Sequence, residues 1–302
     1  MHKFLLVSLA TIALLATCLS SAQQPPSAPL ATHQLTSNVY WVEGGVSNSG
    51  VIVGDKGVIV VDTKMTPQNG KQLLDEVAKI TPKPVTTVIL THRDVDHIGG
   101  LPSFPKGIEI IAHEITPSKP VPPPSSVSGA PGPGGPRPTV TPTRVVTGNK
   151  EALTINGVKI QLLHWAPAHT SGDLIVYLPE QKIAFAGDIL ALDFDTPLIH
   201  ADQNGSSAGW IETVKGMLAL DADKYVPGHG GIQTKQSIET RLKAAEAERD
   251  EIKKLVGQGK SLPEVQAAVG DPKPTDLKSG ASGVRFPPYS EVVYNEFTKK
   301  TQ

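Results

Sequence analysis

The most constraining feature of this sequence is a cluster of metal-binding side chains directly after an apolar, strand-like segment. Residues 85–90 are rich in Val, Ile and Thr, which favours a buried β-strand. The following residues, 91–100, read Thr-His-Arg-Asp-Val-Asp-His-Ile-Gly-Gly. A loop at a strand end can direct several side chains into one space, and imidazole and carboxylate groups are ligands of hydrolytic metal sites. The segment therefore offers four candidate ligands: His92, Asp94, Asp96 and His97.

The pattern favours two metal ions rather than one, because adjacent Asp96 and His97 cannot comfortably serve one ion together with their neighbours. Gly99 and Gly100 are expected to let the chain turn sharply towards the site. Predicted strands at 158–164, 182–186 and 224–226 are each followed by a further candidate, in a turn or beside glycine. A single histidine after a strand is usually structural, but this ordered set indicates one shared cleft. The three downstream candidates are His169, Asp188 and His229.

The rest of the chain alternates short β-rich runs with a few helical stretches. Apolar spacing predicts helices at 67–80, 208–220, 236–256 and 289–299, with a capping-box match at 261–264 before another short helix. We expect a signal peptide at 1–22, a linker at 23–35 and a single domain at 36–302. Within that domain, 14 of the 26 residues at 117–142 are Pro or Gly, which predicts a surface insertion. The C-terminal helices are expected at 233–300, outside two β-rich halves.

These motifs resemble the metallo-β-lactamase-fold superfamily over about residues 36–231. The usual pattern there is T-H-x-H-x-D-H-x-G-G, then a single His, a Gly-Asp pair and a Gly-His pair. The sequence departs once, with Asp94 where a second histidine usually stands. The resemblance implies an α/β fold, the four-layer αβ/βα sandwich of this superfamily. It also implies a division of the ligands: His92, Asp94 and His169 for the first ion, Asp96, His97 and His229 for the second, and Asp188 bridging both.

The aspartate at position 94 bears on the identity of the metal. A carboxylate is harder than imidazole and is anionic, and the site would hold three carboxylates in all. Relative to an all-histidine set, this weakens the zinc preference and favours Mn²⁺ or Fe²⁺. We expect two divalent cations, and zinc remains the favoured ion in a periplasmic protein.

The expected chemistry is hydrolysis by a metal-bound hydroxide that attacks a carbonyl carbon, with Asp96 orienting the hydroxide by analogy with the family. The substrate would be a small ester, lactone, thioester or amide. A bridging aspartate such as Asp188 resembles the lactonase and glyoxalase-II-like branches, whereas true β-lactamases usually carry Cys or Ser there. A periplasmic metallo-β-lactamase is the first alternative, and a non-catalytic binding protein on the same scaffold is the second. The insertion and the 193–204 loop are expected to shape the pocket.

Composition and the N-terminal segment limit the partners. Basic and acidic residues nearly balance, at 28 and 29. The sequence therefore does not indicate the basic face of a nucleic-acid-binding protein, and we do not expect nucleic-acid binding. The apolar run at 4–16 is too short to span a membrane and fits a leader, which predicts a periplasmic or secreted protein. Stable membrane insertion is not expected. A lipid anchor at Cys18 is a disfavoured alternative, because Thr17 precedes the cysteine.

A few other residues are weaker candidates. His164 is expected to be packed in a strand. His113 and His200 are expected in loops, where surface exposure is favoured over the alternative that they line the pocket. Asp173 would either orient His169 or stabilise the turn between the two residues. Arg93 would face either the carboxylates of the ligand segment or solvent. Ser206 or Ser207 lies in a G-x-S-x-G match at 205–209, but the context predicts a helix N-cap rather than a nucleophile.

Overall fold

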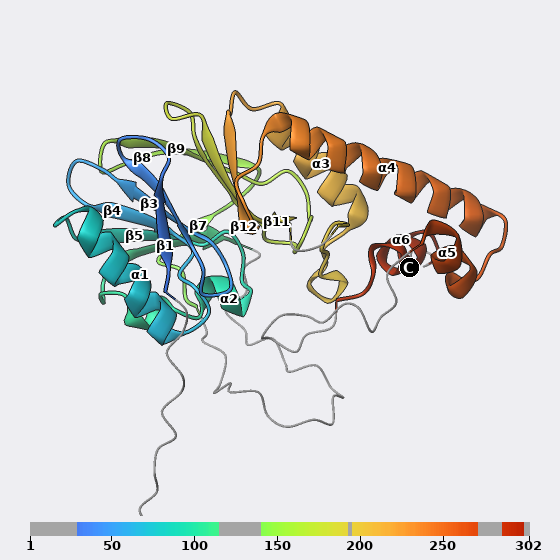
Figure 1. Cartoon of the computed structure of the whole chain (residues 1–302), viewed down its shortest axis with the longest axis horizontal. Coiled ribbons are helices and arrows are strands. Elements are labelled where there is room, and N and C mark those ends of the chain that lie inside the picture. Colours follow the sequence, from blue (N-terminus) through green and yellow to red (C-terminus); the bar gives the residue numbers. More distant parts are fainter. Residues whose placement is uncertain (1–28, 115–139, 193–194, 271–285, 299–302) are drawn as a thin grey trace, which may run out of the picture.

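The computed structural model describes residues 29–114, 140–192, 195–270 and 286–298. The expected signal peptide and most of the expected insertion at 117–142 lie outside these residues. The described residues build two β-sheets, packed face to face and flanked by helices (Figure 1).

The first sheet contains seven strands in sequential order. The strands from β1 to β4 pair antiparallel, and those from β4 to β7 pair parallel. Short runs rich in Val and Ile form the central strands, where both faces are covered. The strands are β1 (Ala31–Gln34), β2 (Val39–Glu43), β3 (Ser49–Val53), β4 (Val58–Val61), β5 (Val85–Ile89), β6 (Glu109–His113) and β7 (Arg144–Val146).

The second sheet contains five strands in the order β12-β11-β10-β9-β8. All neighbours pair antiparallel except β11 and β12, which are parallel. Its strands are β8 (Lys150–Ile155), β9 (Val158–Leu163), β10 (Ile175–Leu178), β11 (Ile183–Ala191) and β12 (Lys224–His229).

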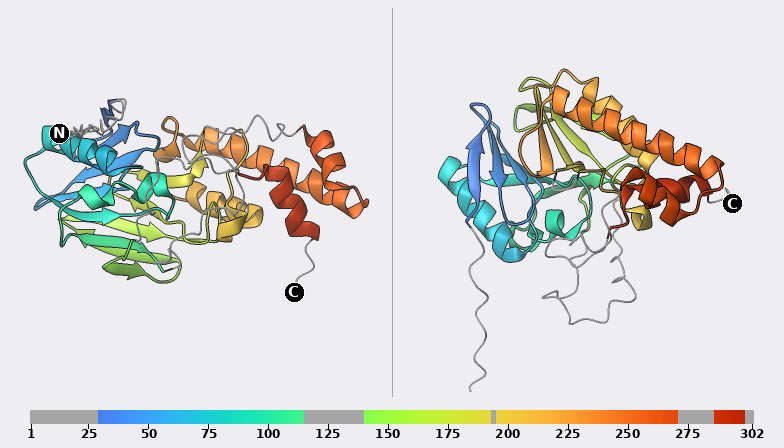
Figure 2. Two further views of the ribbon diagram at one scale, coloured as in Figure 1. Left: turned by 90° about the horizontal axis from the view of Figure 1, so that it is seen from below. Right: turned by 45° about the vertical axis from the view of Figure 1, so that its right-hand side comes forward.

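Helices cover the outer face of each sheet. Helix α1 (Pro67–Ile80) packs on the first sheet, whereas α3 (Ser207–Leu218) and α4 (Lys235–Gly257) pack on the second. Helices α5 (Leu262–Val269) and α6 (Tyr289–Thr298) pack against α4, at the end of the molecule away from α1 (Figure 2). The layers therefore run helix, sheet, sheet, helix.

Strand β4 shows how the sequence specifies these layers, because all four of its residues are buried. Ile59 and Val61 point into the core between the sheets, and Val58 and Val60 point to the core beneath α1. Alternating side chains that are apolar on both faces require a layer on each side. The expected αβ/βα sandwich is thus confirmed.

Helix starts follow the capping signals in the sequence. Helix α1 begins as predicted, with Thr66 accepting a hydrogen bond from the Asn69 amide. Ser206 caps α3 by accepting from the Gly209 amide, which confirms the structural interpretation of the G-x-S-x-G match. The predicted capping box before α5 is also present, between Ser261 and Glu264.

Several strands depart from the sequence-based expectations. The end of the expected linker forms β1, which pairs with β2, and β7 was not predicted. Strand β11 does not end before Asp188 but continues to Ala191, with register shifts around Gly187. The φ of Gly187 is +52°, a conformation that glycine adopts readily, so the strand can bend there without ending.

The described helices were also compared with the requirements of a membrane span. Among the residues with a described position, no helix combines the length and apolar character needed to cross a bilayer. Helix α4 is long enough, but charged residues occur throughout its sequence.

Leu73 tests the packing of α1. Its side chain is fully buried against the first sheet. We expect Leu73→Ala to lower the free energy of unfolding by about 2–5 kcal/mol, since the change leaves a cavity. Exposed Lys71, on the same helix, gives the control Lys71→Ala, which should change it by about 0.5 kcal/mol or less. Urea denaturation measures both, and equal effects would contradict this packing.

Candidate metal centre

The seven ligand candidates from the sequence come together where the two sheets meet at one edge. The segment after β5 supplies four of them, the β9–β10 connection supplies His169, and β11 and β12 supply Asp188 and His229. They form two groups that share Asp188, each with its ligand atoms within 4.8 Å of one another. We call them the first group (His92, Asp94, His169 and Asp188) and the second group (Asp96, His97, His229 and Asp188).

The first group is compact. The Nε2 atom of His92 lies 3.7 Å from Asp94 Oδ2 and 3.8 Å from Asp188 Oδ2. The Nε2 atom of His169 lies 3.2 Å and 3.8 Å from the same two oxygens. Four ligands at metal bonds of about 2.1 Å in tetrahedral geometry are about 3.4 Å apart, so these spacings suit one cation.

The second group has similar spacings. The Nε2 atom of His97 lies 3.5 Å from Asp96 Oδ2 and 3.1 Å from Asp188 Oδ1. The Nε2 atom of His229 lies 3.1 Å from Asp96 Oδ2 and 3.3 Å from Asp188 Oδ2. Asp188 therefore lies close to the imidazoles of both groups.

Hydrogen bonds at Nδ1 turn three of the imidazoles so that Nε2 faces the centre. His97 Nδ1 lies 2.8 Å from Asp62 Oδ2, and His169 Nδ1 lies 2.9 Å from the Leu198 carbonyl oxygen. Both partners are acceptors, so Nδ1 donates to them. In the neutral Nδ1–H tautomer, Nε2 has the lone pair that binds a cation.

His92 is held in the same tautomer through Thr91. The Thr91 hydroxyl donates to Asp62 Oδ2 at 2.7 Å and lies 3.0 Å from His92 Nδ1. Because the hydroxyl proton is engaged, Thr91 accepts from the His92 Nδ1–H. Asp62 thus orients both His92 and His97, and sequence reasoning missed it because it stands apart from the ligand motif.

Unsatisfied atoms also point to a cation. His92 Nε2, His97 Nε2 and Asp188 Oδ1 are buried and make no hydrogen bond. Buried polar atoms are normally hydrogen-bonded, because leaving them unsatisfied is costly. Here the atoms converge on the space between the ligands, and a divalent cation in each group would satisfy them. The residues present therefore fit two cations.

The ligand loop is fixed by close backbone contacts. A Cβ atom on Gly99 would come within 1.8 Å of the Met65 carbonyl oxygen, and one on Gly100 equally close to that of Thr63. The chain turns at 99–100 as predicted, but neither glycine has a positive φ, so the turn does not depend on a glycine-specific conformation. The pair instead allows the loop to lie directly against residues 63–65.

Asp94 has an unusual position, as the N-cap of the four-residue helix α2 (Val95–Ile98), yet its side chain does not cap the helix. Its carboxylate instead contacts His169, His200 and Gln203. The expectation that His200 is exposed is wrong: only 6% of its surface is accessible, because it packs against the ligand groups.

Charge interactions shift the pKa values of the centre strongly. Burial would raise the pKa of Asp188, but the positive charges of His229 and His97 hold it well below the usual range. Burial would lower the pKa of His97, but the nearby Asp188, Asp96 and Asp62 carboxylates raise it well above its usual value. The centre therefore strongly favours charged carboxylates.

The other candidates from the sequence have structural roles. His113 is buried rather than exposed, and its ring stacks on His164 at 4.2 Å. Asp173 forms the turn at Thr170 by accepting from its amide and hydroxyl, and no described hydrogen bond joins it to His169. Arg93 donates to Gln203 and so does not simply face solvent.

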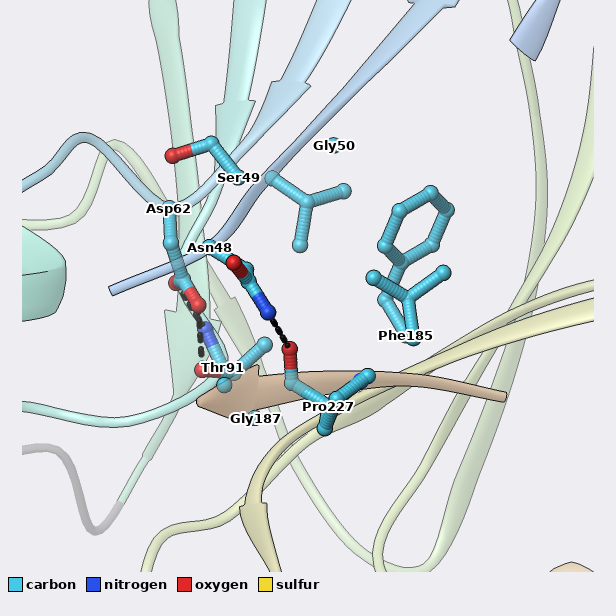
Figure 3. A pocket seen from close by; sticks show the side chains of 11 residues that line it. Asn48, Ser49, Gly50, Asp62, Thr91, Phe185, Gly187 and Pro227 are labelled. Carbon is cyan, nitrogen blue, oxygen red and sulfur yellow. Dashed lines mark hydrogen bonds between the residues drawn. The ribbon is translucent and has the colours of Figure 1, made fainter. Parts of the chain in front are cut away.

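A small cavity of about 10 Å³ lies beneath the centre, between the sheets (Figure 3). Asp62 and Thr91 line it, together with Asn48, whose amide donates to the carbonyl oxygens of Pro227 and Gly230 on either side of His229. The cavity has room for about one water molecule and is too small for an organic substrate.

The comparison with family models identifies the class of protein. Residues 42–229 match the model described as the metallo-beta-lactamase superfamily, and this is more than half of the chain. The chain belongs to this superfamily, whose members, such as alkylsulfatases and metallo-β-lactamases, are metal-dependent hydrolases.

Two curated relatives show the range of similar proteins. The 2,4-dinitroanisole O-demethylase subunit alpha of Nocardioides sp. is 30% identical over 66% of this chain and 57% of its own length. A metallo-beta-lactamase type 2 of Bacillus sp. is 27% identical over 68% of this chain and 78% of its own. The chain thus spans little more than half of the demethylase subunit.

Solved structures share the fold. The stereoselective inverting sec-alkylsulfatase of Pseudomonas sp. superposes with a TM-score of 0.67 at 17% identity, over 89% of this chain and 50% of its own. A metallo-beta-lactamase from Pontibacter korlensis superposes with a TM-score of 0.58 at 20% identity, over 72% of this chain and 99% of its own.

Asp62 tests how the centre is held. We expect Asp62→Asn to weaken metal binding by about 10- to 100-fold, because the acceptor for His97 Nδ1–H and Thr91 loses its charge. Exposed Asp75→Asn is the control and should bind metal normally. Calorimetric metal titration measures the affinities, and normal binding by Asp62→Asn would show that Asp62 does not orient the ligands.

Proposed function

We propose that this chain is a binuclear metal-dependent hydrolase that acts on the carbonyl group of a small ester, lactone, thioester or amide. The observation that carries the proposal is the place of Asp188, whose carboxylate lies within 3.8 Å of imidazoles in both ligand groups. A carboxylate shared by both groups suits a centre with two neighbouring cations better than it suits two independent metal sites.

The residues of the two groups would have different roles in hydrolysis. When bound, two divalent cations would supply Lewis acidity and lower the pKa of a water molecule. His92, Asp94 and His169 would hold the first cation, and Asp96, His97 and His229 the second. The Asp96 side chain is 17% exposed, among the more accessible of the group. It would therefore meet solvent, orient the attacking water and accept its proton.

Zinc is the proposed metal, with Mn²⁺ or Fe²⁺ as alternatives. The four imidazoles of the centre favour zinc, whereas the three carboxylates favour harder cations. The choice depends most on Asp94, which replaces a neutral ligand by an anionic one.

A β-lactam substrate is the second candidate. The similarity to type 2 metallo-beta-lactamases supports it, while an aspartate at position 188 favours the ester and lactone class. The expected leader at residues 1–22 supports export to the periplasm, where a β-lactam would be encountered, although these residues lie outside the described structure. N-terminal sequencing of the exported protein would test cleavage after Ala22.

A substrate panel tests the proposed function. The protein loaded with Zn²⁺ or Mn²⁺ is offered nitrophenyl esters, lactones, thioesters, amides and nitrocefin, with alkyl sulfates included because of the alkylsulfatase relatives. We expect turnover of a carbonyl substrate, its loss on chelation and its return with added metal. Activity in Asp188→Ala should fall by orders of magnitude. Metal-independent turnover, or turnover of alkyl sulfates alone, would contradict the proposal.

Substitutions of Asp94 test its role as a ligand. Asp94→Ala should bind one ion normally and the other weakly, with hydrolysis falling by orders of magnitude. Asp94→His should bind two ions and shift the preference towards Zn²⁺ over Mn²⁺, since imidazole is the softer ligand. Elemental analysis and hydrolysis rates measure both variants. Unchanged metal content in Asp94→Ala would remove Asp94 from the ligand set.

A further inference from the structure

His200 faces two carboxylates. Its Nε2 atom lies 2.8 Å from Asp94 Oδ2, and its Nδ1 atom lies 3.0 Å from Asp202 Oδ1. Both ring nitrogens thus face carboxylate oxygens, and His200 is not a member of the first group. It is placed to hold Asp94.

Gln203 holds the second oxygen of the same carboxylate. Its Nε2 donates to Asp94 Oδ1 at 2.8 Å, and Arg93 donates to its Oε1. The arginine fixes the direction of the amide, because it requires the oxygen to face away from Asp94. Both Asp94 oxygens thus accept a hydrogen bond from the short segment that contains the 3₁₀ helix η2 (Ala201–Gln203).

Backbone hydrogen bonds join this segment to the loop that carries His169. The His200 amide donates to the His169 carbonyl oxygen at 2.8 Å, and the Ser171 amide donates to that of Gln203 at 3.0 Å. The two donors to Asp94 and the ligand His169 therefore lie in one hydrogen-bonded unit.

The C-terminal part of the chain packs on His200. Phe286, just before α6, places its ring 4.4 Å from that of His200. Helix α6 is in turn fixed to the start of α3, because Glu296 accepts from the amide and hydroxyl of Ser207 at 2.6 and 2.5 Å. Arg249 of α4 lies 3.4 Å from the same carboxylate. The aromatic contact is thus anchored in the helical layer.

We propose that His200 is a positioning residue that holds the Asp94 carboxylate in the first group, and that Phe286 keeps His200 in place. An aspartate reaches less far than a histidine and, as an N-cap, would otherwise turn towards the amides of α2. Two donors aimed at its oxygens hold it towards His92 and His169. The inference rests on the proposed function in so far as Asp94 is a metal ligand.

Two-step calorimetric titration with Co²⁺, together with its visible absorption, tests this proposal. Asp94→Ala first identifies the step that belongs to the first ion. In His200→Ala that step should weaken by about 10- to 100-fold, as for other residues that orient ligands, while the second ion binds normally. His200→Gln keeps a donor and should recover most of the loss. Phe286→Ala should weaken the same step several-fold, and Phe286→Leu should do so less.

The control is His113→Gln, which alters a buried histidine whose ring stacks on His164 rather than on a candidate ligand. It should leave both steps unchanged. Should His200→Ala not fold, Gln203→Leu removes the other donor and should weaken the same step. Normal binding of the first ion in His200→Ala or Gln203→Leu, or equal weakening of both ions, would overturn the inference. If Asp94→Ala itself changes neither step, it is the proposed ligand set that fails.

Discussion

The structure depends on three carboxylates held at the edge of an apolar sandwich. Asp94, Asp96 and Asp188 lie among four imidazoles, and Asp188 is only 4% exposed. Burying charged groups is costly unless opposite charges and hydrogen bonds compensate for it. Two divalent cations would supply that compensation, since they are often the largest local charges in such a site. The ligand arrangement is therefore the feature of the described structure whose buried charges most need compensation.

Different sets of residues stabilise the fold and orient the ligands. Apolar side chains between and outside the sheets stabilise the sandwich, and the polar residues gather where β5, β11 and β12 end or bend. A second set of residues then orients the ligands. Asp62 acts on the histidines of both groups, directly or through Thr91, whereas His200 and Gln203 act on Asp94. The aspartate at position 94 thus has partners suited to a carboxylate.

Much of this arrangement could be predicted from the sequence, because the signals are local. The Val- and Ile-rich runs predicted most strands, and helical periodicity predicted both ends of α1. The ligand candidates were found from their spacing and their family resemblance. The residues that orient them were missed, since their contacts are not local: Gln203 stands 109 positions from Asp94. Burial of His113 and His200 was also missed, because His113 is the last residue of β6, where a loop was expected, and His200 lies in a loop.

Anomalous diffraction from crystals of the metal-loaded protein tests the central claim most directly. Data collected on both sides of the metal absorption edge would locate each cation and identify its element. We predict two peaks, one among His92, Asp94 and His169 and the other among Asp96, His97 and His229, with the Asp188 carboxylate touching both. A single fully occupied peak, or two peaks of which only one contacts Asp188, would contradict the binuclear centre.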